Sequence, residues 1–188
     1  KSFFLTEAEL DEGTYTEIRL VLDNEGGDQN SGTYLEFSDG SKELLKVPSG
    51  TSSGYKAKGE ITITEDAVTA ITLDLDLRKA VVKAGNSGKY LLKPVVRMIA
   101  TEKAGVVKGT YTSDISADHA VVYAYEENSF ETSESNEGDD GSFFPNAVTS
   151  SRIDDDMAFT LAFLEAGDYE LIFAEHDSDG KFVQFIGK

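Results

Sequence analysis

An unbroken alternation of apolar and polar residues runs through residues 71–78, which read ITLDLDLR. Successive side chains of a β-strand point to opposite faces, so the four aliphatic side chains of this stretch would share one face. The pattern predicts a strand from Ala70 to Arg78 with one dry side and one wet side, as antiparallel sheets have. Asp74 and Asp76 would then stand on the wet face, about 6.5 to 7 Å apart.

Similar segments recur on both sides of this stretch. Runs rich in β-branched and aromatic residues, bounded by turn-forming residues, predict strands at residues 14–22, 34–37, 44–47, 58–64, 89–99, 106–111, 120–125, 147–152, 158–164, 169–174 and 182–186. Asp39-Gly40 is a strong hairpin signal between the second and third of these runs. No segment keeps a helical period. The fold class we expect is all-β, with two antiparallel Greek-key β-sandwich domains in tandem.

Charge divides the chain of 188 residues into two parts. Residues 1–103 carry 13 basic and 17 acidic side chains, whereas residues 104–188 carry 4 and 18. The step predicts a boundary near residues 101–105, with a first domain at 1–103 and a small acidic second domain at 104–188. The net charge of −18 argues against a nucleic acid or an anionic bilayer as partner.

One spacing occurs in both halves. Residues 10–15 and 164–169 both read Leu-x-x-Gly-x-Tyr immediately before an expected strand. The pattern is typical of the tyrosine corner of Greek-key sandwiches, in which a Tyr hydroxyl bonds to nearby backbone. The alternative is a glycine turn followed by a tyrosine that favours strands.

Motifs for catalysis are weak in this sequence. Residues 50–54 (GTSSG) match a nucleophile elbow, but a strand pattern follows where the elbow needs a helix. Asp74 and Asp76 have the separation of glycosidase carboxylates, yet both are expected on a wet, ion-paired face. The chain has no Cys, and His119 and His176 stand far apart in sequence. We therefore expect no enzyme and no catalytic residue.

Calcium is the cofactor that the sequence suggests. Asp177-Ser178-Asp179-Gly180, together with Glu175, has the form of half a calcium loop, although an EF-hand is excluded because Ile186 stands where the bidentate Glu belongs. Asp154, Asp155 and Asp156 form a second cluster. A further acidic stretch comprises Glu126, Glu127, Glu131, Glu134, Glu137, Asp139 and Asp140. The candidate ligands are Asp177, Asp179, Glu175, Asp154, Asp155 and Asp156; solvated acidic turns are the alternative.

Three segments resemble a known family in order and spacing. They are residues 44–50 (LLKVPSG), 73–81 (LDLDLRKAV) and 88–97 (GKYLLKPVVR). Together they are similar to an uncharacterised domain of bacterial surface lipoproteins, over about residues 5 to 100. In the second half, residues 105–109 (GVVKG) and 159–169 (FTLAFLEAGDY) follow another known pattern, and on these segments residues 104–188 resemble the carboxypeptidase-regulatory or transthyretin-like sandwich modules. The resemblance implies export, anchoring through an upstream lipidated Cys and a non-catalytic role at the cell surface or outer membrane.

Members of that family usually carry further strands and the lipidation Cys ahead of the segment that begins near Phe4. If those strands belong to the same sheet, the first domain has an open edge that an upstream segment or another chain would complete. We therefore expect a surface module with a structural, adhesive or assembly role. The alternative is a binding module for calcium or glycans, with loop aromatics at Tyr55, Tyr125, Phe130, Phe143 and Phe144. Phe143 and Phe144 could equally enter the core, and a hydrolase ranks third.

Overall fold

The computed structural model describes residues 5–21, 33–48, 54–84, 88–93, 95–112, 119–139 and 141–188. These residues fold almost entirely into β-strands arranged in four sheets, which confirms the expected all-β sandwich class. Among them the α-helical residues form a single turn, α1 (Leu77–Ala80). In the described part of the chain, no helix is long and apolar enough to cross a membrane.

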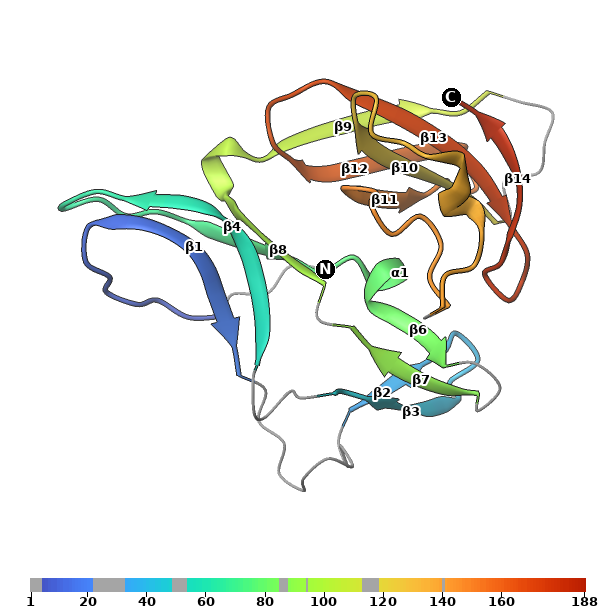
Figure 1. Cartoon of the computed structure of the whole chain (residues 1–188), viewed down its shortest axis with the longest axis horizontal. Helices are drawn as coiled ribbons and strands as arrows, with labels where there is room; N and C mark the ends of the chain where they lie inside the picture. The colour runs from blue at the N-terminus through green and yellow to red at the C-terminus, as the bar shows by residue number, and fades with distance from the viewer. Residues whose placement is uncertain are drawn as a thin grey trace.

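The first half of the chain forms two four-stranded sheets (Figure 1). One has the order β1-β4-β8-β5 and consists of β1 (Gly13–Leu20), β4 (Tyr55–Ile63), β8 (Val96–Ala100) and β5 (Ile71–Asp74). The other has the order β2-β3-β7-β6 and consists of β2 (Tyr34–Glu36), β3 (Lys42–Lys46), β7 (Lys89–Leu92) and β6 (Val81–Ala84). The expected antiparallel pairing is wrong at two places in this half: β3 with β7 and β4 with β8 pair in parallel, so both sheets are mixed.

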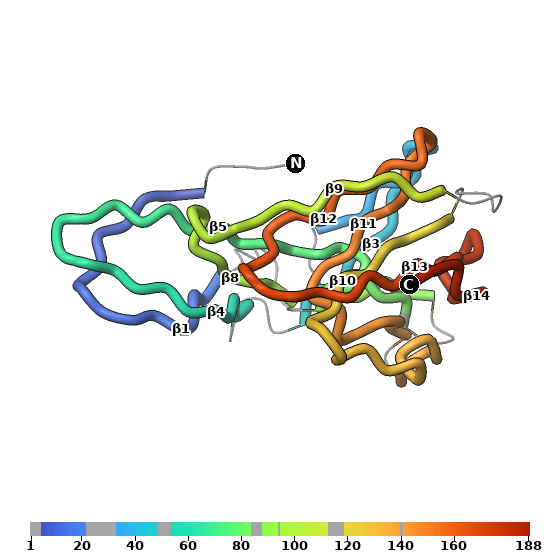
Figure 2. Tube along the Cα trace, turned by 90° about the horizontal axis from the view of Figure 1, so that it is seen from above, coloured from blue at the N-terminus to red at the C-terminus, as the bar shows by residue number. Residues whose placement is uncertain are grey.

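The second half also forms two sheets, and all of their strand pairs are antiparallel. The larger has the order β11-β10-β13-β14 and consists of β11 (Thr149–Arg152), β10 (Ala120–Glu126), β13 (Tyr169–His176) and β14 (Phe182–Gly187). The smaller pairs β9 (Gly105–Thr110) with β12 (Ala158–Leu164). Figure 2 shows this half at one end of the molecule and the β1–β4 pair at the other.

The expected strand over residues 70–78 is wrong beyond Asp74. The strand β5 ends there, and Asp76 caps α1 by accepting a hydrogen bond from the Arg78 backbone N–H at 3.0 Å. Ile71 and Leu73 pack against the core as expected, but Leu77 is 61% exposed. An aspartate is among the best helix N-caps, so local capping ends the alternation.

The expected strand over residues 89–99 is two strands in different sheets. Its first part is β7, which pairs with β3 and β6, and its second part is β8, which pairs with β4 and β5. Position 94 between them is a proline, which has no N–H to donate to a central ladder. The sequence pattern predicted the strand character of this stretch but not the change of sheet.

Each half has a hydrophobic core, and the larger sheet of the second half is covered on both faces. Its central strand β10 alternates between them: Ala120, Val122 and Ala124 pack toward the β9–β12 pair, and the intervening residues pack on the other side. Every residue of β10 except its last is buried. The core on the face away from β9 and β12 is called the second core. The loop between β10 and β11, which contains the 3₁₀ turn Thr132–Ser135, supplies Phe144 and Ala147 to it.

Both tyrosine corners are confirmed. The Tyr15 hydroxyl donates to the carbonyl of Asp11, and the Tyr169 hydroxyl donates to the carbonyl of Glu165, each at 3.0 Å and each four residues upstream. The same six-residue pattern therefore builds the same bond at the start of β1 and of β13.

Replacing either corner tyrosine by phenylalanine removes only this hydroxyl. We expect Tyr15→Phe and Tyr169→Phe each to lower the free energy of unfolding by about 1 kcal/mol, the usual net value of one hydrogen bond. Urea unfolding of the two variants measures the loss. Variants as stable as the parent chain would show that the two corner hydrogen bonds do not contribute to the free energy of unfolding.

All strand pairs of the described residues join strands on the same side of residues 101–104. The connection is the 3₁₀ turn Thr101–Lys103, which follows β8 and leads into β9. The division into domains at 1–103 and 104–188 stays a prediction.

Candidate functional site

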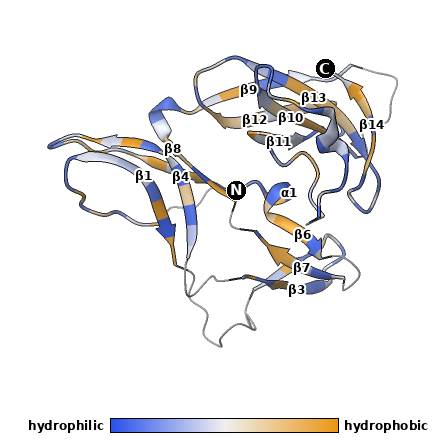
Figure 3. Cartoon of the chain, viewed as in Figure 1, coloured by the Kyte–Doolittle hydropathy of each residue, from blue (hydrophilic) through white to orange (hydrophobic). Residues whose placement is uncertain are grey.

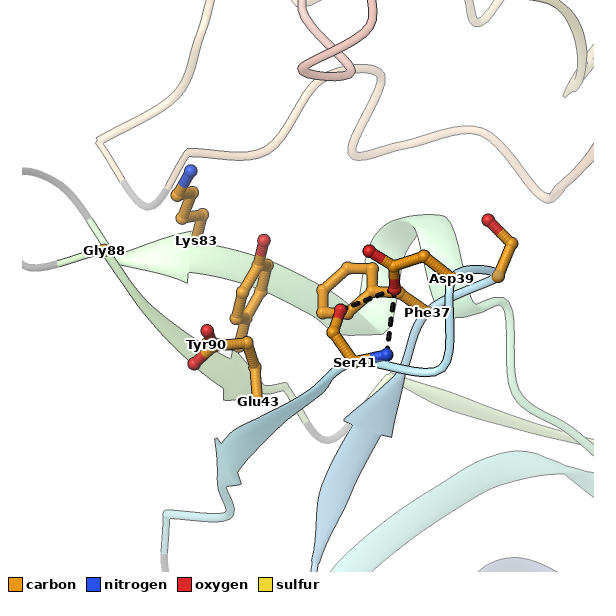
Figure 4. A pocket seen from close by; sticks show the side chains of 8 residues that line it. Phe37, Asp39, Ser41, Glu43, Lys83, Gly88 and Tyr90 are labelled. Carbon is orange, nitrogen blue, oxygen red and sulfur yellow. Dashed lines mark hydrogen bonds between the residues drawn. The ribbon is translucent and has the colours of Figure 1, made fainter.

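A pocket opens on the sheet β2-β3-β7-β6, next to the turn that joins β2 to β3 (Figure 4). Its volume is about 450 Å³, within the range of roughly 300–1,000 Å³ that small-molecule sites occupy. The lining residues come from the β2–β3 hairpin, from β6 and β7, and from the position just before β7: Phe37, Ser38, Asp39, Ser41, Glu43, Lys83, Gly88 and Tyr90.

The hairpin turn gives the pocket one fixed wall. The Asp39 carboxylate accepts hydrogen bonds from the Ser41 backbone N–H at 2.8 Å and from the Ser41 hydroxyl at 2.6 Å. The hydroxyl bond and then the backbone bond lower the pKa of Asp39, so the side chain is an anion at neutral pH. Gly40 has a φ of 82°, a left-handed conformation that glycine adopts without strain. The predicted Asp-Gly turn thus places a carboxylate at the rim.

Two aromatic rings from separate parts of the sheet face this space. Phe37 follows β2, Tyr90 lies in β7, and their ring centroids are 5.9 Å apart at an interplanar angle of 56°. Phe37 is 38% exposed. Lys83 is paired with Tyr90 across β6 and β7, and Glu43 of β3 also lines the pocket (Figure 4). Apolar ring faces surrounded by hydrogen-bonding groups of both charges suit a polar, ring-shaped ligand such as a sugar.

The structure removes three of the aromatic residues that the sequence suggested for ligand binding: Tyr55 and Tyr125 are wrong, and Phe144 takes its alternative place in the core. Tyr55, Tyr125 and Phe144 are buried in the hydrophobic cores. The Tyr55 hydroxyl donates to the Leu92 carbonyl at 2.8 Å, and burial raises its pKa to about 12. The other two, Phe130 and Phe143, are half-buried and pack against the second core. Sequence reasoning missed Phe37 and Tyr90, because both fall in segments assigned to strands.

Two of the candidate calcium ligands hold turns. Asp154 Oδ1 accepts hydrogen bonds from the backbone N–H groups of Asp156 and Ala158, at 3.1 and 2.8 Å. Asp177 Oδ1 accepts from the backbone N–H groups of Asp179 and Lys181, both at 2.9 Å. These carboxylates act as local caps of tight turns.

The remaining candidates do not join them in one site. Glu175 accepts a hydrogen bond from Gln184 Nε2 at 2.6 Å, and the side chains of Asp155, Asp156 and Asp179 are exposed. Across the residues that the structure describes, no three His, Asp or Glu side chains are placed to hold a metal ion together. Calcium binding stays a prediction, and an unchanged melting temperature in calcium and in EDTA would end it.

One carboxylate of the acidic stretch is buried. Glu134 is 8% exposed and accepts hydrogen bonds from the Tyr125 hydroxyl at 2.9 Å and from the backbone and side-chain amide groups of Asn146, at 3.0 and 3.1 Å. These three donors pair both of its oxygens. Glu134 therefore connects the β10–β11 loop to β10. Asp140 of the same acidic stretch lies outside the described residues.

Asp74 and Asp76 have separate partners. Asp74 forms an ion pair with Arg97 of β8 at 2.6 Å, so it is ion-paired as expected, but only 16% of its side chain is exposed and the expected wet face is wrong there. Asp76 caps α1 and also accepts a hydrogen bond from the Ser150 hydroxyl at 2.8 Å. The elbow-like residues 50–53 lie outside the described residues.

His176 is a buried histidine within a cage of aromatic rings. Its Nδ1 lies 3.1 Å from the Gly180 carbonyl oxygen, which can only accept, so Nδ1 carries the proton. Nε2 then accepts from the Tyr123 hydroxyl at 2.9 Å. Burial lowers the pKa of His176, and the Arg78 charge lowers it further, while the bond to Gly180 and the Asp177 charge oppose the shift. His176 holds the β13–β14 turn.

Acid should weaken the fold through His176. Because its folded pKa is depressed, its neutral form contributes stability above the unfolded-state pKa of about 6.5, and that stability is lost as pH falls through the folded pKa. We expect the free energy of unfolding to drop more between pH 7.5 and 5.5 in the parent chain than in His176→Phe. The matched control is His119→Gln, at an exposed histidine. Equal pH dependence in the parent and His176→Phe would contradict this.

Fold and pocket define the class as an all-β protein of sandwich type with an aromatic-lined surface pocket. A family model described as a domain of unknown function (DUF4382) matches residues 1–94, which is half of the chain. The chain belongs to this family. No curated protein and no solved structure matches it.

Proposed function

We propose that the chain is a non-catalytic structural, adhesive or assembly module that works outside the cytoplasm at a bacterial surface. The observation that carries the proposal is the outer edge of β1. This strand is eight residues long and pairs, within the described residues, with β4 alone. An edge strand presents unpaired N–H and C=O groups that a further strand can bond.

The segment ahead of β1 carries exposed apolar side chains. Leu5 and Leu10 are 67% and 46% exposed. A strand added beside β1, from an upstream segment or a second chain, would bond the backbone and give these side chains apolar contacts. The resemblance to surface lipoproteins supports export and anchoring through an upstream lipidated Cys, and the strand pattern and corner of residues 104–188 support a carboxypeptidase-regulatory or transthyretin-like module.

Association through β1 is tested by measuring molar mass across a concentration series. We expect dimers or longer polymers in the parent chain. Thr14→Lys combined with Thr16→Lys, two exposed positions of β1, should favour monomer because lysines on an edge oppose pairing. Thr160→Lys, on an exposed position of β12, is the matched control. A parent chain that is monomeric throughout, with slow hydrogen exchange at every strand edge, would contradict the assembly role.

Location is tested separately on intact cells. A surface module should be cut by added protease before lysis, whereas protection until the cells are broken would contradict surface exposure.

The aromatic pocket favours a second candidate function, the binding of a glycan. Phe37 and Tyr90 offer ring faces, and Asp39, Ser41, Glu43 and Lys83 offer hydrogen-bonding groups within the same cavity. A purely structural module predicts no hits on a glycan array.

Any array hit must depend on the pocket. Phe37→Ala should abolish binding while leaving the fold intact, because this ring is partly exposed. Tyr34→Ala is the matched control, since Tyr34 is an exposed aromatic of the same hairpin outside the pocket lining. Glycan binding that survives Phe37→Ala would show that the pocket is not the binding site.

A further inference from the structure

We infer that α1 and β6 form a docking surface for the second half of the chain, and that this surface makes the two halves unfold as one unit. The surface consists of residues 76–83. Its first six residues (DLRKAV) are the end of segment 73–81, one of the three that carry the family resemblance. In Figure 1, α1 lies between the sheet β2-β3-β7-β6 and the second half.

Two of the hydrogen bonds between described residues cross from one half to the other. Lys79 Nζ donates to the Ala147 carbonyl at 2.5 Å, and the Ser150 hydroxyl donates to Asp76 Oδ2 at 2.8 Å. Asp76 uses its other oxygen, Oδ1, to cap α1. One carboxylate thus fixes both the helical turn and the partner segment, which ties the local structure of the first half to the position of the second.

The contacts follow an antiparallel register. Asp76 contacts Ser150. Lys79, three residues after Asp76, contacts Ala147, which lies three residues before Ser150. Further along, a Cβ added to Gly141 would lie 3.1 Å from the Lys83 carbonyl oxygen, so the two backbones approach closely there. Three contacts in one direction over residues 76–83 and 141–150 describe a matched surface.

Charge at the junction is balanced around a half-buried cation. Burial lowers the pKa of Lys79, while Asp76, Glu134 and Asp74 favour its charged form and Arg97 opposes it. Glu134 belongs to the second half and is itself buried. Separation of the halves would return Lys79 to solvent, break its hydrogen bond to the Ala147 carbonyl and remove the favourable influence of Glu134.

The surface fits a partner of defined chemistry. It accepts a segment that presents a backbone carbonyl and, three residues later, a hydroxyl, with glycine where the chain passes Lys83. Residues 141–150 supply all three as Gly141, Ala147 and Ser150. The short turn Thr101–Lys103 is then a connection between docked units and not a hinge. This inference does not depend on the adhesive or assembly role.

Hydrogen exchange across a urea series tests the inference on the full chain. Amides of β4 in the first half and β10 in the second should become exposed at the same urea midpoint. In Lys79→Met combined with Ser150→Ala, the two midpoints should separate. Lys108→Met, at an exposed lysine of β9, should leave them coincident.

Two outcomes would overturn the inference. Separate midpoints in the parent chain would show that the halves are independent. Coincident midpoints in the double variant would show that these residues do not couple them. If the double variant fails to fold, Ser150→Ala alone removes only the hydrogen bond from the Ser150 hydroxyl to Asp76. Separate urea midpoints of β4 and β10 in this single variant would then support the inference, and coincident midpoints would overturn it.

Discussion

Gly59→Ala is expected to cost at least about 3 kcal/mol of stability, at the upper end of overpacking penalties. A Cβ at this position would overlap the carbonyl oxygen of Met98 on β8. Backbone on a central strand cannot move aside as a flexible side chain can, so β4 and β8 would have to separate. Their parallel pairing, which holds the first sheet together, would weaken.

The register explains why glycine stands there. Tyr15 pairs with Ile61 and Glu17 with Lys58, so Gly59 and Glu60 of β4 lie opposite the single residue Thr16 of β1. This is a β-bulge, which bends the strand and brings its backbone close to β8. The curvature of β4 is visible in Figure 1.

Urea unfolding of Gly59→Ala measures the cost. The matched control is Gly187→Ala in β14, where an added Cβ makes ordinary contacts of 3.5 to 3.6 Å with Phe173 and Tyr111. We expect the control to change stability by about 0.5 kcal/mol or less. A Gly59→Ala variant as stable as the control would contradict the close approach of β4 and β8.

Phe144→Ala is expected to cost about 3 to 5 kcal/mol, the usual range for a buried aromatic. Phe144 is fully buried and stacks on Tyr123 with ring centroids 4.2 Å apart. Phe182 and His176 meet it edge-on at 5.7 and 6.0 Å. Its removal opens a cavity in the core that joins the β10–β11 loop to the sheet.

The measurement is again urea unfolding, with Phe37→Ala as the control. Phe37 is the same residue type but partly exposed, so its loss should cost far less. A near-neutral Phe144→Ala would show that the loop does not close over the sheet as described.

Residue patterns predicted most strands and both tyrosine corners because these depend on local spacing. A Tyr two residues after Gly reaches back to the same carbonyl in both halves. The Asp39-Gly40 hairpin also forms as predicted. Figure 3 shows the same local signal, with hydrophobic residues within β6 and β7 and hydrophilic residues at the chain's turns.

What the pattern missed depends on contacts between distant residues. The alternation of residues 71–78 carries no sign that Asp76 will cap a turn and bond Ser150, 74 positions away. The two parallel pairs follow from the change of sheet between β7 and β8. The pocket joins Phe37 to Tyr90 across 53 positions, and only the hairpin turn beside Phe37 was a signal for it.

The outer edge of β1 is the centre of the functional proposal, and hydrogen exchange of its amides at rising protein concentration tests it most directly. Within Gly13–Leu20, the amides that point away from β4 should exchange more slowly as the chain becomes concentrated, while those of β12 keep a constant rate. Exchange of β1 amides that stays the same at every concentration, in a chain of constant monomeric mass, would contradict it.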